Sequence, residues 1–145
     1  MFYPDLKQKI DAGEIIVGDL VWVTGYYHSN FAERPTRHVP PTLVQIVVNE
    51  ENPFYKSWAW VDYTFRACGN SGKLLKTVIM PFDKSRQDVR SAGSLDIFFT
   101  EEEANTAYIE AAKIVRDGIA QTQLDWAKRF TAMLSEVDER IAKNL

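Results

Sequence analysis

The chain has 145 residues, of which 46% are hydrophobic, and a net charge of −3. A chain of this length buries roughly two-thirds of its unfolded surface, so we expect a single domain with one core. Basic and acidic residues balance at 11 each in residues 1–99, whereas residues 100–145 carry 6 basic and 9 acidic residues. General nucleic-acid binders depend on a basic excess to neutralise phosphates, so this balance argues against that class.

Cysteine and hydropathy patterns indicate the compartment. Cys68 is the only cysteine, which excludes a disulfide within the chain and fits a reducing cytoplasm. The sequence has neither the pattern of a secretory leader nor a run of about 18 apolar residues, so we expect neither secretion nor membrane insertion.

The first 99 residues predict a short helix followed by a small sheet. Residues Pro4–Ala12 favour a helix, because Leu6 and Ile10 lie four positions apart and Gly13 can end it. Runs rich in β-branched and aromatic residues predict antiparallel strands at Ile15–Tyr27, Thr42–Asn49, Ser57–Ala67, Leu74–Met80 and Leu95–Phe99. We expect these strands to close into an SH3-like β-barrel.

The segments between these runs contain turn residues. Gly69–Gly72 supplies the positive φ angles of a hairpin, and Gly18-Asp19 predicts a bulge or a kink that lets one long first strand serve two sides of the barrel. The longest irregular segment, residues 28–41, contains three prolines. Because proline disfavours both helices and central strands, we expect a loop there, and loops of this length are often functional.

Residues 100–145 predict a long amphipathic helix that belongs to the same domain. Thr100 and Glu103 form a capping signature. One apolar stripe follows, made by Ala104, Tyr108, Ala111, Ala112, Val115, Ile119, Trp126, Phe130, Met133, Val137 and Ile141. The stripe keeps its phase across Gly118, which favours one continuous helix over residues 101–143. A helical hairpin with a second helix capped by Thr122 and Asp125 is the alternative.

A continuous helix has a consequence for association. It would be about 65 Å long, whereas a domain of this size is only about 40 Å across. The apolar residues beyond the sheet, namely Trp126, Phe130, Met133, Val137 and Ile141, would then lie in water, and exposed stripes of this kind mark interfaces. We therefore expect a homo-oligomer, most simply a dimer through these residues.

Candidate binding residues cluster around the proline-rich loop. Guanidinium groups recognise phosphate and aromatic rings stack on bases, so this cluster could hold an anionic small molecule, although ordinary loop residues are the alternative. Its members are Tyr26, Tyr27, His28, Arg34, Arg37 and His38. Trp58 and Trp60 either form a stacking platform or pack beneath the long helix. The spacing of the two histidines does not suit a metal site.

The sequence contains no pattern that predicts catalysis. The segment Gly69–Lys73 resembles a phosphate-binding loop only superficially, because two residues rather than four separate its glycines. Asp19, Asp62 and Asp96 lie near strands at spacings that pair no two of them for acid–base chemistry. We therefore expect a non-enzymatic protein without a cofactor.

Three segments carry a resemblance to a known group of proteins. The order of a short helix, IIVGDLVWV, PTLVQIVV and SLDIFFTEEEANTAYIEAA is similar to that of small phage-encoded accessory proteins with an SH3-like barrel and a trailing helix. The resemblance implies a viral protein in the host cytoplasm that binds and inhibits a host protein or defence component. The alternatives are a protein that sequesters a signalling nucleotide at a subunit interface and an SH3-like nucleic-acid-binding module.

Overall fold

The fold is α+β, with one antiparallel sheet between two helices. The computed structural model describes residues 1–27, 37–49, 61–79, 81 and 95–145. In chain order the elements are α1 (Tyr3–Asp11), β1 (Leu20–Tyr27), β2 (Arg37–Val48), β3 (Tyr63–Cys68), β4 (Leu74–Ile79), β5 (Asp96–Phe98) and α2 (Glu101–Lys143). The strand order is β4-β3-β2-β1-β5. Within these described residues β4 and β5 are the two edges and do not pair, so the sheet is open and the closed barrel is not confirmed.

One face of the sheet holds the main core. The strands contribute alternate residues to it because side chains two apart share a face, and α1 covers them with Tyr3 and Leu6. The buried sheet residues of this core are Val21, Val23, Val44, Ile46, Phe65 and Ile97. Pro4 opens α1 near the position where a proline costs no hydrogen bond. The predicted short helix is therefore confirmed within one residue at each end, and it packs over the core.

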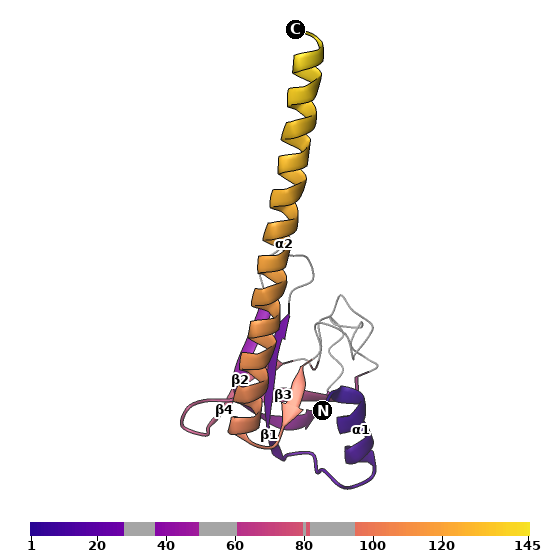
Figure 1. Cartoon of the computed structure of the whole chain (residues 1–145). Helices are drawn as coiled ribbons and strands as arrows, with labels where there is room; N and C mark the ends of the chain where they lie inside the picture. The colour runs from indigo at the N-terminus through magenta and orange to yellow at the C-terminus, as the bar shows by residue number, and fades with distance from the viewer. Residues whose placement is uncertain (28–36, 50–60, 80, 82–94) are drawn as a thin grey trace.

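The opposite face lies against the first half of α2. This helix contacts β1, β2 and β5, and Ala104 and Val115 are its buried residues. Figure 1 shows α2 crossing the sheet and then continuing far beyond it. The sheet therefore has a helix on each face, and β3 buries the neighbouring residues Phe65 and Thr64, which point to opposite faces.

Two of the three loop prolines lie in a central strand, which corrects the sequence-based prediction. Strand β2 begins at Arg37 and contains Pro40 and Pro41. The register with β1 shifts between Val23 and Gly25, because one extra β2 residue is accommodated there. The β3 strand pairs only with Val44–Val48, so the prolines meet no β3 partner and no ladder bond is lost on that side.

The long first strand was also predicted wrongly. Strand β1 begins at Leu20, not at Ile15. Gly18 has a φ of 104° and donates its N–H to the carbonyl of Ile46 at 2.8 Å. Asp19 Oδ2 accepts from the N–H of Ile16 at 3.1 Å. These contacts make Ile16–Asp19 a turn that leads into β1 and touches β2, so it is neither a bulge nor a kink within a strand.

The predicted hairpin turn is confirmed. Gly69 donates its N–H to the carbonyl of Lys73 at 2.7 Å, and Gly72 donates to the carbonyl of Gly69 at 2.9 Å. Gly72 has a φ of 76°, which glycine adopts without strain. The turn joins β3 directly to β4 in an antiparallel pair.

The continuous C-terminal helix is confirmed, and the helical hairpin is excluded. Helix α2 runs from Glu101 to Lys143 through Gly118. Thr100 caps it by accepting from the N–H of Glu103 at 3.3 Å, and its hydroxyl in turn donates to the Glu103 carboxylate at 2.8 Å. The Thr122 hydroxyl donates to the Gly118 carbonyl at 2.9 Å, a bond inside a helix, so Thr122 does not cap a second one. Neither described helix is both long and apolar enough to cross a membrane.

Candidate functional site

Two of the predicted binding residues meet at one point on the head, by which we mean the sheet with α1. Tyr26 in β1 and His38 in β2 are register partners, and their rings stack with centroids 5.4 Å apart. Tyr108 of α2 joins them, because its ring centroid lies 5.4 Å from that of Tyr26. The Tyr108 hydroxyl is 2.9 Å from His38 Nδ1. We name Tyr26, His38 and Tyr108 the aromatic cluster.

The aromatic cluster has the chemistry of a binding surface. His38 is exposed, while Tyr26 and Tyr108 are half-buried, so the cluster presents ring faces and polar groups together. The bond between Tyr108 and His38 holds the imidazole in place, and its direction depends on the histidine tautomer. Such rings can stack on a planar group or pack against an apolar side chain of a protein.

The other head candidates lie outside the described part of the chain, either as whole residues or with their side chains. His28, Arg34, Trp58 and Trp60 lie outside the described residues. Tyr27 and Arg37 form the last register pair of the β1–β2 hairpin, and their side chains fall outside the described part. The predicted packing of Trp58 and Trp60 beneath the long helix and the predicted anion-binding arginines therefore stay predictions.

The second candidate surface is the distal half of α2. Every side chain from Gln123 to Leu145 is exposed, as predicted for a helix longer than its domain. We name the following residues, which are between 42% and 58% exposed, the distal stripe: Trp126, Phe130, Met133, Val137 and Ile141. The rings of Trp126 and Phe130 lie 5.5 Å apart, and the Arg129 guanidinium lies 6.0 Å from the Trp126 ring.

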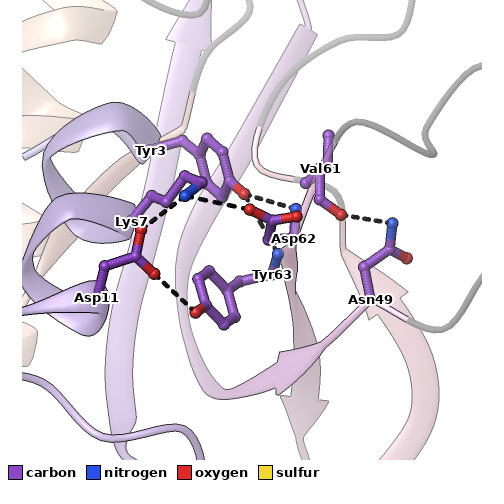
Figure 2. A network of polar contacts seen from close by, with 7 residues as sticks. All are labelled: Tyr3, Lys7, Asp11, Asn49, Val61, Asp62 and Tyr63. Atoms are coloured by element: carbon purple, nitrogen blue, oxygen red, sulfur yellow. Dashed lines mark hydrogen bonds and ion pairs between the residues drawn. The ribbon is translucent and has the colours of Figure 1, made fainter. Parts of the chain in front are cut away.

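A third group of polar residues holds α1 against β3 (Figure 2). The backbone N–H groups of Asp62 and Tyr63 donate to the hydroxyl of Tyr3 at 2.9 and 3.2 Å. Lys7 Nζ lies 2.6 Å from Asp11 Oδ2 and 3.1 Å from Asp62 Oδ2. The Tyr63 hydroxyl donates to Asp11 Oδ1 at 3.0 Å. Each contact joins α1 to the start of β3 or links residues within α1, so we interpret this network as structural.

Replacing Tyr3 by phenylalanine is expected to lower the free energy of unfolding by about 1–3 kcal/mol, because two backbone N–H groups lose their acceptor in a partly buried setting. Urea unfolding of the native protein and of the Tyr3→Phe variant, at the same protein concentration, measures the difference in the free energy of unfolding. Tyr63→Phe is the matched control, since it removes an exposed hydrogen bond and should cost less than about 1 kcal/mol. Equal losses in the two variants would contradict the structural importance of the buried hydroxyl.

The same network predicts a pH dependence of stability. The hydrogen bond and ion pair with Lys7, and then the Tyr63 hydroxyl, lower the pKa of Asp11 below its ordinary value of 3.8. A carboxyl with a lowered pKa in the folded state stabilises the fold above that ordinary value and loses this contribution as the pH falls through the folded pKa. The melting temperature of the native protein should therefore exceed that of Asp11→Asn at neutral pH. This difference should shrink below about pH 4, and a pH-independent difference would contradict the assignment.

Carboxylates near the strands have structural partners. Asp62 faces Lys7, Asp96 accepts from the amino group of Met1 at 2.9 Å, and Asp19 caps the turn before β1. No cluster of three metal-ligating side chains occurs among the described residues.

Comparison with protein-family models, with curated proteins and with solved structures finds no match to this chain.

Proposed function

We propose that this chain is a non-enzymatic binding protein that acts through contact with another protein. One observation carries the proposal: the distal half of α2 is exposed on all sides and still presents a continuous apolar stripe. Exposed apolar surfaces of this kind are costly in water and normally mark interfaces. Catalysis is not part of the proposal, because the carboxylates near the strands serve the fold.

In this function the head contacts a target protein. The distal half of α2, which we name the rod, associates with another chain. The aromatic cluster supplies the contact surface on the head, because it presents two tyrosines, a residue type enriched in interface hot spots, beside an exposed imidazole. Following the resemblance of the sequence to phage accessory proteins, the target is a host protein or defence component, and the action is inhibition by occupation. A single cysteine fits an action in the reducing host cytoplasm.

Affinity capture from a bacterial lysate followed by titration with the purified partner tests this function. We expect one protein in stoichiometric amount, bound at least tenfold more weakly by the double variant Tyr26→Ala/His38→Ala. Phe99→Ala is the matched control, because Phe99 is an exposed aromatic residue outside the cluster, and it should bind as the native chain does. Failure to recover a stoichiometric partner, or equal binding by the double variant, would contradict the proposal.

A second candidate function is the sequestration of a signalling nucleotide. The stacked rings of Tyr26 and His38 favour it, because a purine base stacks on such a surface. A ligand that binds only the folded state raises the melting temperature by mass action. Thermal shift with cyclic nucleotides and ADP-ribose derivatives should then raise the melting temperature of the native chain but not of Tyr26→Ala/His38→Ala. An unchanged melting temperature with every ligand excludes this candidate.

We also propose that the sheet is part of an SH3-like barrel. An SH3-like barrel is supported by the order β4-β3-β2-β1-β5, in which four strands follow one another as a meander and β5 returns beside β1. Closure would require β5 to approach the far end of that meander. The SH3-like nucleic-acid-binding alternative lacks the basic excess that such binding needs.

A further inference from the structure

Helix α2 is built on an 11-residue repeat. Two apolar positions recur at this spacing along the helix, and Ala111, Thr122 and Met133 follow the same spacing beside them. The two apolar sets are Ala104, Val115, Trp126 and Val137, and Tyr108, Ile119, Phe130 and Ile141. Eleven residues in three turns give 3.67 residues per turn, close to the 3.6 of a straight helix, so the repeat stays on one face. Repeats of this length are typical of straight or slightly right-handed helical coils.

The first part of this repeat shows how its face is used. Ala104 and Val115 are buried where α2 crosses the sheet, and Thr122 is the last residue of intermediate exposure. The same face then continues as the distal stripe, which is about 22 Å long at 1.5 Å per residue, on the part of α2 that extends beyond the sheet (Figure 1). This face packs against the sheet in its first half and has no partner among the described residues in its second half. A second helix with the same repeat would fit the free half.

We propose that a second copy of this chain packs antiparallel along the distal half of α2, with Met133 at the centre of the interface. This inference deepens the proposed function, on which it rests, by naming the occupant of the distal stripe. An antiparallel pair centred on Met133 brings apolar residues to within one residue of the same level in every layer: Met133 faces Met133, Phe130 faces Val137, and Trp126 faces Ile141 of the second copy.

Charge complementarity selects the antiparallel direction. One flank of the distal stripe carries a charged residue directly before each outer apolar residue, in the order Asp125, Arg129, Glu136 and Arg140. In an antiparallel pair this flank meets itself, which places Asp125 beside Arg140 and Arg129 beside Glu136 of the second copy. Both pairs are of opposite sign, and the two-fold symmetry repeats each of them.

A parallel pair would lose this match. It brings the charged flank of one helix to the opposite flank of the other, which carries Ala127, Leu134 and Asp138. Asp125 and Glu136 would then find no basic partner from the second copy. Glu136 and Arg140 already pair within the single helix at exposed positions, so exchanging that contact for one between copies requires little desolvation.

The length of the free segment fits the same register. With Met133 at the centre, Lys143 of one copy lies level with Gln123 of the other. Gln123 is the first residue of the fully exposed stretch of α2. The overlap therefore uses the whole free segment and stops where the sheet of each copy begins to cover α2. The two heads lie at opposite ends of the rod, so each dimer presents two aromatic clusters to its targets.

Disulfide cross-linking tests the direction and the register. In a full-length Cys68→Ser background, Met133→Cys should form a disulfide-linked dimer by itself, because the two residues face each other. Trp126→Cys and Ile141→Cys should each stay uncross-linked alone and should cross-link when the two differently tagged variants are mixed and re-equilibrated. Cross-linking of each outer variant with itself, or none in any combination, would overturn the antiparallel pair.

A charge exchange tests the flank independently. Arg129→Glu is expected to weaken dimerisation about tenfold, since each dimer loses two attractions and gains two repulsions. Arg129→Glu combined with Glu136→Arg should restore the native dissociation constant, and Asp138→Lys on the other flank should leave it unchanged. Absence of restoration would contradict the pairing. Target binding by the head is measured separately, with monomeric and dimeric variants. This measurement distinguishes a wrong pairing of the helices from a wrong proposed function.

Discussion

Replacing Phe130 and Met133 together by glutamate is expected to convert the proposed dimer to folded monomers. Each dimer would bury four unpaired carboxylates in the central layers of its interface, and an unpaired buried charge costs several kcal/mol. We expect the dissociation constant to rise by more than about 100-fold, which corresponds to about 2.7 kcal/mol. Sedimentation velocity over a concentration series measures this change.

The helix itself should survive the substitution. Both positions are about half exposed in the single chain, and glutamate is a good helix former, so circular dichroism should retain its helical signal. Leu124→Glu/Ser135→Glu is the matched control, because it adds the same charges on the opposite face of α2. A native dissociation constant for the Phe130 and Met133 variant, or equal weakening by the control, would contradict the assignment of the interface.

Replacing Phe65 by alanine is expected to lower the free energy of unfolding of the head by about 3–5 kcal/mol. Phe65 is fully buried in the middle of the sheet, opposite Ile46 of β2, and its loss leaves a cavity between β3 and the α1 side of the core. Because a dimer couples stability to concentration, native and variant chains should be compared in urea at one protein concentration.

Val78→Ala is the control for this core prediction. Val78 lies in β4 and is exposed, so its truncation should change the free energy of unfolding by less than about 0.5 kcal/mol. The distal half of α2 lies outside the core, so dimerisation of the folded Phe65→Ala variant should keep its native dissociation constant. A loss no larger than that of the control would contradict the central position of Phe65.

The sequence predicted the helices well because their signals are local. The cap at Thr100, the single phase of the apolar stripe and the absence of an interior proline together predict α2 from residue 101 to 143, and the structure agrees at both ends. The turn at Gly69–Gly72 was predictable for the same reason, since a short glycine-bounded segment between two β-rich runs has few other solutions.

The strand boundaries depended on partners that no local pattern reveals. Pro40 and Pro41 disfavour a central strand only where both neighbours pair with them, and the bulge in β2 together with the late start of β3 pairing removes that conflict. Similarly, Ile15–Val17 reads as a strand because of its β-branched residues, whereas the turn contacts of Gly18 and Asp19 keep it outside the sheet.

The candidate site was predicted in part. Tyr26 and His38 were proposed as neighbours, and the β1–β2 register brings them together. Tyr108 was interpreted only as part of the apolar stripe, because the sequence fixes which face of α2 is apolar but not where that face crosses the sheet. That crossing is visible only in the structure, where Tyr108 lies one turn after Ala104, the first buried residue of the helix.

The central claim is that the distal stripe is covered by a second copy of the chain. Light scattering coupled to size-exclusion chromatography measures the mass in solution directly. The account predicts a species of twice the chain mass of 16.6 kDa for the native protein and of the single chain mass for Phe130→Glu/Met133→Glu. A native protein that elutes with the mass of one chain at every concentration would contradict it.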